Sequence, residues 1–264
     1  MTRVEGENTR LRHYERSPPS QNLMLFARLW KCSNIQFVFC SIILNLKLLL
    51  RALKSLLIQQ RRGDHSAPIP AARALSDYHK NGKIGYMHID CHLDSAPDWA
   101  GTTTTNASGT ARAFELPNCS AKNMAHMGSR NGLNPKDWHD FFVDNNVRVI
   151  PMLEAVERGV DVCTKEIFDI AWDGTDAVYC SWDTDSLDAS CMPGKTAPEP
   201  FGIKAREAIQ IARIAGTYGA DVLEISELCP IFDVSVMSTK LACCMLYHFL
   251  GSRARTLIDQ GKQP

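Results

Sequence analysis

Apolar, strand-like runs alternate with helical segments along residues 63–264. Five runs are predicted to be strands: Ile84–Ile89, Asn123–Met127, Val147–Pro151, Asp176–Trp182 and Asp221–Ile225. Six helices are predicted between and after them: Pro70–His79, Pro135–Asn145, Met152–Gly159, Cys163–Trp172, Ile203–Tyr218 and Ser235–Leu250. Strands separated by helices of this length require crossover connections, which are right-handed and leave the strands parallel. The pattern therefore predicts an α/β domain with a mainly parallel sheet.

Residues 1–62 have a different composition, and we expect them to be an atypical N-terminal extension. Their polar beginning contains glutamates, which argues against a mitochondrial transit peptide. The apolar stretch that follows predicts a helix at about 23–57. Its densest part, Ile35–Leu50, is shorter than the roughly 20 apolar residues that a membrane-spanning helix needs. A buried or interfacial helix is favoured, and a membrane anchor through 35–50 is the weaker alternative.

Charge and cysteine content narrow the choice of function and compartment. The chain has 29 basic and 29 acidic residues, so no broad basic field is available to bind nucleic acid. Its ten cysteines form no CxxC pair, which leaves a zinc ribbon or a thioredoxin-like site without support. Most of them lie in apolar runs, as expected of buried thiols in a reducing compartment. A cytoplasmic location is expected, with mitochondrial or membrane-associated locations as alternatives.

Two short runs, HIDCHLD and SWDTD, each follow a predicted strand. In an extended backbone alternate residues point the same way, so Asp90, His92 and Asp94 would converge, as would Asp183 and Asp185. Ligands of a parallel sheet gather at the carboxyl ends of its strands, where both runs fall. Four carboxylates would repel one another there unless cations lay between them. The sequence therefore predicts a two-metal hydrolytic centre.

Two further motifs join these runs. GDHS at 63–66 contributes His65, and ELCP at 227–230 contributes Glu227 after another strand. The order, spacing and strand context of GDHS, HIDCHLD, SWDTDSLD and ELCP resemble the ureohydrolase superfamily, the relatives of arginase and agmatinase. The resemblance covers residues 63–250 and is nearest to the agmatinase-like branch.

This resemblance implies a three-layer α/β/α fold and a dinuclear centre, usually manganese, with nickel in some guanidine-hydrolysing relatives. The implied metal ligands are His65, Asp90, His92, Asp94, Asp183 and Asp185. Asp90 and Asp183 would bridge the two ions. Carboxylate and imidazole ligands without a thiolate fit Mn²⁺ or Ni²⁺. His88 lies outside the alternating set of ligands, and a structural role behind them is preferred for it.

The resemblance also implies an activity, the hydrolysis of a small guanidino compound to urea and an amine. Agmatine, a guanidino acid and guanidine itself all remain open as substrates. Asp94 would accept a proton from the attacking water, and Glu227 would hold the guanidinium by charge-assisted hydrogen bonds. Packing and substrate binding are both open for His126, in a strand near the substrate pocket of relatives. Relatives usually form trimers or hexamers, which predicts a homo-oligomer.

Three departures from the family pattern predict weaker activity. Asn106 stands nearest to the position of a histidine that relatives use to shuttle protons, and an amide cannot exchange protons near neutral pH. Lys195 and Phe201 replace small residues near the expected site entrance, where they would narrow the substrate channel. Relatives also have several strand–helix units before the GDHS-like motif, and residues 1–62 contain nothing like them.

That third departure predicts an N-terminally incomplete relative, with an uncovered sheet edge and an unsupported loop around His65. Two alternatives to the enzyme follow. One is a catalytically impaired, truncated ureohydrolase-like protein that binds metal or a partner. The other is a membrane-tethered form anchored through Ile35–Leu50.

Overall fold

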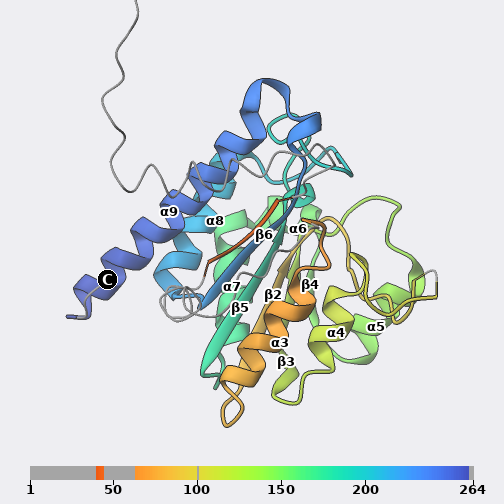
Figure 1. Cartoon of the computed structure of the whole chain (residues 1–264), viewed down its shortest axis with the longest axis vertical. Coiled ribbons are helices and arrows are strands. Elements are labelled where there is room, and N and C mark those ends of the chain that lie inside the picture. Colours follow the sequence, from red (N-terminus) through yellow and green to blue (C-terminus); the bar gives the residue numbers. More distant parts are fainter. Residues whose placement is uncertain (1–39, 45–62, 100, 262–264) are drawn as a thin grey trace, which may run out of the picture. The chain divides into compact units, whose positions relative to one another are not determined.

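In the part of the chain that the structure describes, six strands form one sheet in the order β1-β6-β5-β2-β3-β4, with helices on both faces (Figure 1). The computed structural model describes the backbone of residues 40–44 and all of residues 63–99 and 101–261. The strands are β1 (Cys40–Leu44), β2 (Ile84–Ile89), β3 (Cys119–Met127), β4 (Arg148–Ile150), β5 (Ala177–Asp183) and β6 (Val222–Leu228). Strands β2 to β6 are parallel to their neighbours, and β1 is antiparallel to β6. The predicted mainly parallel sheet is confirmed.

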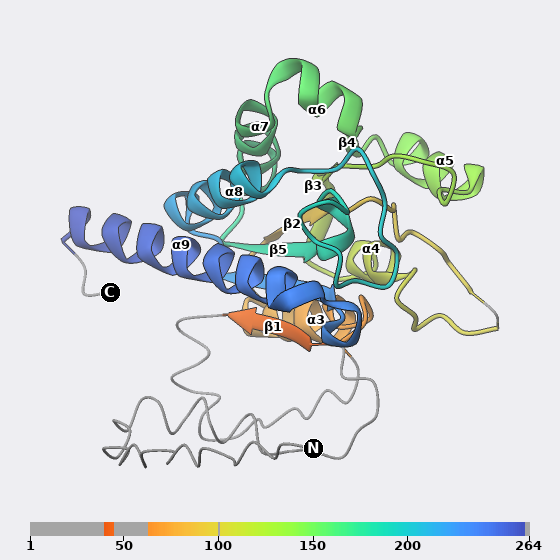
Figure 2. The ribbon, with the colours of Figure 1, turned by 90° about the horizontal axis from the view of Figure 1, so that it is seen from above.

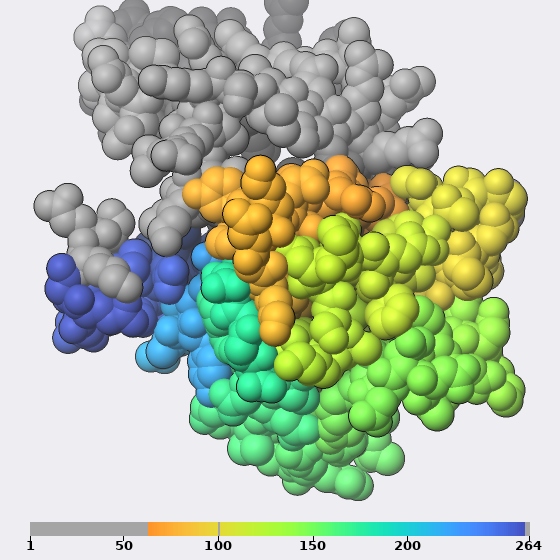
Figure 3. Space-filling view, turned by 90° about the horizontal axis from the view of Figure 1, so that it is seen from below, coloured from red at the N-terminus to blue at the C-terminus, as the bar shows by residue number. Residues whose placement is uncertain are grey.

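Helices in the described residues cover both faces of this sheet. They are α3 (Pro68–Tyr78), α4 (Gly109–Phe114), α5 (Lys136–Asp144), α6 (Met152–Arg158), α7 (Val160–Trp172), α8 (Ala205–Tyr218) and α9 (Met237–Asp259). Helices α7, α8 and α9 pack on one face, and α3 and α4 lie on the other (Figure 2). In the space-filling view the orange α3 segment and the yellow-green segment that includes α4 meet in one continuous surface (Figure 3). The three-layer α/β/α architecture is therefore confirmed.

Side chains alternate between the two faces because successive residues of a strand point to opposite sides. Along β5, Val178 and Cys180 enter the core beneath α7 and α8, whereas Tyr179 enters the core beneath α3. Gly85 of β2 lets α7 approach closely, since a Cβ built there would lie 2.0 Å from the carbonyl oxygen of Ala171. Strands β2, β5 and β6 are buried along their whole length, as expected of a parallel sheet covered on both faces.

The predicted helix at 23–57 is wrong at Cys40–Leu44, and the rest of that stretch lies outside the described residues. These five residues, CSIIL, form the edge strand β1, with Cys40 opposite Leu228 and Leu44 opposite Leu223. Parallel strand β6 has backbone groups free on its outer side, and β1 supplies partners for them. The edge expected to be uncovered is therefore paired along most of β6.

Helix boundaries follow the predictions within a few residues, except that α4 was not predicted because its six residues are too short for a periodic signal. The long helix α9 begins two residues later than predicted and continues nine residues further, to Asp259. Within the described part of the chain, Val234–Asp259 is the one stretch long and apolar enough to cross a membrane, judged by length and composition. In α9, Met245 and Phe249 are nonetheless buried in the core shared with α8.

Candidate metal centre

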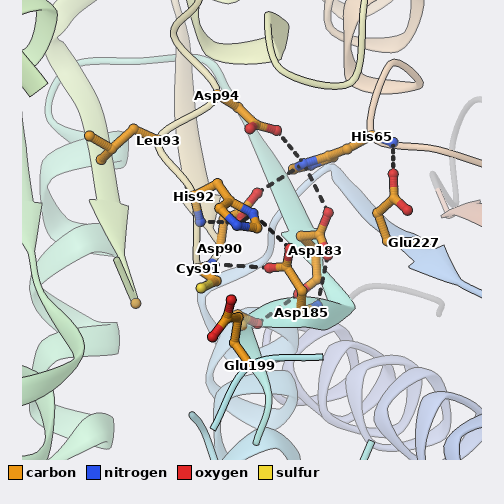
Figure 4. A network of polar contacts seen from close by, with 12 residues as sticks. His65, Asp90, Cys91, His92, Leu93, Asp94, Asp183, Asp185, Glu199 and Glu227 are labelled. Atoms are coloured by element: carbon orange, nitrogen blue, oxygen red, sulfur yellow. Dashed lines mark hydrogen bonds and ion pairs between the residues drawn. The ribbon is translucent and has the colours of Figure 1, made fainter. Parts of the chain in front are cut away.

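The six predicted ligands come together at the carboxyl ends of β2 and β5 (Figure 4). The two strands are adjacent and in register, with Ile89 opposite Trp182, so the residues that follow them emerge at the same edge. The sixth side chain, His65, comes from the loop before α3. His65, Asp90 and Asp183 are all at most 2% exposed, so the cluster is buried.

His65 lies at the centre of one group of carboxylates. Its Nδ1 is 2.9 Å from Oδ2 of Asp90, 2.8 Å from Oδ2 of Asp94 and 3.2 Å from Oδ2 of Asp183. His92 lies at the other end, with Nδ1 2.8 Å from Oδ2 of Asp185 and 3.6 Å from Oδ1 of Asp90. Asp90 therefore contacts both imidazoles and links the two groups.

The convergence arises from tight turns and not from extended strands, which corrects the sequence argument. β2 ends at Ile89, and Asp90 then accepts a hydrogen bond from the backbone N–H of His92 at 2.6 Å. After β5 the same turn recurs, with Asp183 accepting from the N–H of Asp185 at 2.7 Å. An aspartate that bonds the backbone two residues ahead curls the chain, and the alternate side chains still approach one another.

The buried carboxylates of the cluster repel one another strongly in the absence of bound cations. Burial and the charges of Asp185 and Asp94 raise the pKa of Asp90 well above its usual range. Burial alone would lower the pKa of His65, but the carboxylates around it raise the pKa instead. Burial would likewise lower the pKa of His92, yet Asp185 raises it to about 10. Each shift reflects buried carboxylates that require positive charge nearby.

Several atoms in the cluster lack a hydrogen-bond partner although they are buried. They include Nδ1 of His65, Oδ2 of Asp90 and Nε2 of His92. Buried polar atoms are almost always satisfied in native structures, so several orphaned polar atoms in one cluster indicate missing ligands. Oxygen and imidazole donors in this number suit divalent cations such as Mn²⁺. The residues present therefore fit a dinuclear metal centre.

Glu227 lies beside the cluster at the end of β6. Its Oε1 accepts a hydrogen bond from the backbone N–H of His65 at 2.8 Å, and its Oε2 accepts one from Thr196 at 2.6 Å. Its own backbone N–H donates to the carbonyl of Gly63 at 3.1 Å. The loop that carries His65 is therefore supported by β6, contrary to the expectation that it would hang unsupported.

Glu227 and Asp94 also share an unusual backbone conformation. Their φ angles are 60° and 47°, in the left-handed region that side chains other than glycine seldom adopt. Such conformations persist where the surrounding structure enforces them, and they concentrate at functional sites. Both residues were predicted to act in catalysis.

His88 and His126 form a buried pair beneath the cluster. His88 Nε2 is 2.9 Å from Oδ2 of Asp90, and its Nδ1 is 3.0 Å from Nδ1 of His126. Burial and neighbouring imidazoles lower the pKa of both rings, that of His126 to about 3. His88 thus contacts a predicted ligand directly, and its nitrogen could also contribute to a metal site.

Besides Glu227, the sequence makes Asn106 and His126 candidates for substrate binding, and the two lie in different surroundings. His126 is completely buried and packs against Phe142, and its hydrogen bond goes to His88. Asn106 lies in an exposed turn of the loop that precedes α4. No hydrogen bond or ion pair among the described residues joins either side chain to the carboxylates of the cluster, so their substrate-binding roles stay predictions.

Two buried basic side chains, Arg130 and Lys195, support the SWDTD run. Sequence analysis did not single out Arg130, and it placed Lys195 at the site entrance. Lys195 is buried beneath the SWDTD run, where its Nζ donates to the carbonyls of Thr184, Asp185 and Leu187. It does not line an entrance, so the predicted narrowing by Lys195 is wrong. A lysine can extend its aliphatic stem through a core and place its ammonium among carbonyls, which the sequence pattern did not reveal.

Arg130 holds the same run from the other side. Its guanidinium donates to six backbone carbonyls, those of Gly128, Asp185, Ser186, Leu187, Glu199 and Pro200. The side chain is 9% exposed, and the fork geometry of a guanidinium suits several acceptors at once. The only hint in the sequence was its place in HMGSR, directly after a predicted strand.

Comparison with known proteins agrees with this geometry. Residues 45–251 match the family model described as "Arginase family". The chain is 30% identical over 199 residues to proclavaminate amidinohydrolase of Streptomyces clavuligerus, covering 71% of this chain and 60% of that protein. It is 31% identical to guanidinopropionase of Pseudomonas aeruginosa, covering 71% and 58%, and 27% identical to mitochondrial agmatinase of Gallus gallus, covering 71% and 54%.

Solved structures show the same fold. An arginase superfamily protein from Trypanosoma cruzi aligns with a TM-score of 0.68 at 23% identity, covering 76% of this chain and 64% of that one. Formimidoylglutamase from Bacillus subtilis aligns with a TM-score of 0.66 at 24% identity, covering 72% and 59%. This chain belongs to the arginase family, and the predicted ureohydrolase membership is confirmed. It spans a little over half the length of the curated relatives named here.

Proposed function

We propose that this chain hydrolyses a small guanidino compound, of the agmatine, guanidino-acid or guanidine type, to urea and an amine at a two-metal centre. The buried convergence of six oxygen and imidazole donors carries the proposal. Relatives named agmatinase and guanidinopropionase support the substrate class. The water oxygen would bond to the guanidinium carbon, one C–N bond would break, and the water proton would pass to the departing nitrogen.

The proposed metals are two Mn²⁺ ions, with Ni²⁺ as the alternative. His65, Asp90, Asp94 and Asp183 would hold one ion, and Asp90, His92, Asp183 and Asp185 the other. Two bound divalent cations would lower the pKa of a water molecule between them, so that a nucleophile exists near neutral pH.

Two side chains would handle protons and the substrate. Asp94, whose side chain is 8% exposed, would accept a proton from the attacking water and return it to the leaving nitrogen. Each carboxylate oxygen of Glu227 accepts one hydrogen bond and retains a second lone pair for a guanidinium N–H. A charge-assisted pair of this kind orients a planar guanidinium.

The alternative function is a catalytically impaired protein that binds metal or a partner but turns over little substrate. Asn106 favours it, because an exposed amide replaces the titratable group expected in that loop. A proton shuttle contributes roughly 10²-fold or more to turnover, so its loss would slow hydrolysis without abolishing it. A homo-oligomer, trimeric or hexameric, and a cytoplasmic location complete the proposal.

Urea release from a panel of guanidino compounds tests the proposal, with purified chain loaded with Mn²⁺ or Ni²⁺. Asp183→Ala should abolish both urea release and stoichiometric metal binding. Asp188→Ala is the matched control, because Asp188 lies in the same run but bonds Ser190 and Gly202 outside the cluster. Metal binding without urea release would favour the impaired protein, and Asn106→His would then be expected to raise turnover. Absence of metal binding by the wild-type chain would refute the two-metal centre.

A further inference from the structure

Four buried polar side chains form a row across the sheet directly beneath the carboxylate cluster. His126 on β3 is opposite His88 on β2, His88 is opposite Ser181 on β5, and Ser181 is opposite Glu224 on β6. All four are at most 1% exposed. Residues two positions further along β2 and β5 are Asp90 and Asp183, so this row lies one layer below two predicted ligands. Apolar residues would ordinarily fill such a layer.

The β5–β6 half of the row reaches His65. His65 Nε2 lies 2.8 Å from the hydroxyl oxygen of Ser181, across 116 residues of sequence. That hydroxyl in turn donates to Oε2 of Glu224 at 3.0 Å. The three side chains form a continuous buried chain of hydrogen bonds that ends on a carboxylate.

The direction of these hydrogen bonds fixes which nitrogen of His65 carries a hydrogen. A serine hydroxyl has one hydrogen, and Ser181 gives it to Glu224. Ser181 must therefore accept from His65, which requires Nε2 to be protonated. In the neutral ring, Nδ1 then carries the lone pair, and Nδ1 is the atom that faces three carboxylates without a hydrogen-bond partner. The chain of hydrogen bonds thus presents the correct nitrogen to a cation.

We infer that Ser181 and Glu224 are positioning residues that hold His65 in the tautomer and orientation required to bind a metal ion. This inference rests on the proposed role of His65 as a ligand. Partners that orient a metal-bound histidine through its second nitrogen commonly change metal affinity by 10- to 100-fold. Glu224 has no exposed surface, and its Oε2 accepts the hydrogen bond from Ser181.

The test measures Mn²⁺ affinity of the full chain by calorimetric titration of the metal-free protein. Ser181→Ala should weaken the tighter Mn²⁺ site about tenfold. Glu224→Gln should weaken it about threefold, because a neutral amide oxygen is a poorer acceptor than a carboxylate. The double variant should bind no more weakly than Ser181→Ala alone, since Glu224 acts only through the serine. Ser76→Ala removes a buried hydroxyl bonded to Asn118 far from the cluster, and should leave affinity unchanged.

Two results would overturn the inference. One is a Ser181→Ala variant that binds Mn²⁺ as tightly as wild type. The other is a double variant whose loss of Mn²⁺ affinity equals the product of the two single losses, as for independent effects. Should Ser181→Ala fail to fold, the isosteric Glu224→Gln tests the inference alone, and unchanged Mn²⁺ affinity in that variant refutes the positioning role of this hydrogen-bond chain. His65→Ala separates this inference from the proposed function. If that variant keeps wild-type affinity, the proposed ligand set is wrong; if it loses affinity while Ser181→Ala does not, only the positioning role fails.

Discussion

Replacing Arg130 by methionine should destabilise the chain and loosen the SWDTD run. Methionine fills a similar volume but has no donor, so six backbone carbonyls each lose one hydrogen bond. Two of these bonds are short, 2.8 Å to Asp185 and 2.9 Å to Pro200, and the other four are 3.3 Å. The carbonyls of Asp185 and Leu187 would keep Lys195 as a donor, and those of Ser186 and Glu199 would keep a backbone N–H. The carbonyls of Gly128 and Pro200 would have to find water or stay unsatisfied.

The magnitude follows from the two short bonds. A hydrogen bond from a charged donor contributes about 1.5–3 kcal/mol, which gives roughly 3–6 kcal/mol for the pair. Burying the guanidinium in the wild type costs part of that gain, so a net loss of about 3 kcal/mol in the free energy of unfolding is expected. For a domain of this size the loss corresponds to a melting temperature lower by roughly 6–12 °C.

Urea denaturation and thermal unfolding of the metal-free protein measure the change. Arg130→Lys should recover about half of the loss, because it restores the charge but not the planar fork. Arg255→Met is the control, since Arg255 is 76% exposed and bonds only Asp259 on its own helix; no measurable change is expected there. A loss below about 1 kcal/mol in Arg130→Met would refute the view that these carbonyls depend on Arg130.

Three further outcomes are expected. Gly128→Ala should lower the free energy of unfolding by about 2 kcal/mol or more, because Gly128 has φ 114° and a Cβ there would lie 2.7 Å from the carbonyl oxygen of Asp90. Gly132 has open space around it, so Gly132→Ala should leave stability unchanged in the same denaturation assay. Burial alone would raise the pKa of Asp188, but hydrogen bonds from Ser190 and from backbone N–H groups lower it to about 2. A carboxyl whose pKa is lower in the folded than in the unfolded state stabilises the fold fully at pH above the unfolded pKa of about 4, and this stabilisation is lost as the pH falls through about 2. Asp188→Asn should therefore be less stable than wild type by about 1 kcal/mol at pH 7 and equal to it near pH 2. Adding Mn²⁺ at about 100 times its dissociation constant should stabilise the metal-free chain by about 2.7 kcal/mol, a gain that a chelator reverses and that is absent in Asp183→Ala.

Much of the fold was predictable because its signals are local. Strand β2 matches its predicted bounds, and the other parallel strands differ by a few residues at their ends. Buried parallel strands appear in the sequence as short apolar runs. The helices between them are long enough for the crossover connection that joins parallel strands. Four motifs indicated the family: GDHS, HIDCHLD, SWDTDSLD and ELCP. Those that follow strands were expected at one edge of the sheet because the carboxyl ends of parallel strands meet there.

The strand β1 could not be predicted, since an apolar run of this kind is compatible with helix or strand until a partner is known. Its pairing with β6 is an interaction between residues more than 170 positions apart. Short helix α4 was missed for lack of a periodic pattern. In each case the deciding energy comes from contacts that are distant in sequence.

The sequence by itself determined the order of the parallel strands and helices along the chain and the six donors of the candidate metal centre. Tertiary structure alone decided how those donors are held. Register between β5 and β6 sets Ser181 opposite Glu224, and the loop of His65 then closes onto Ser181. Arg130 and Lys195 both donate to the backbone carbonyl of Asp185, from positions 55 and 10 residues away in the sequence. A buried polar side chain is stable only with its partners in place, and those partners exist only once the sheet has formed.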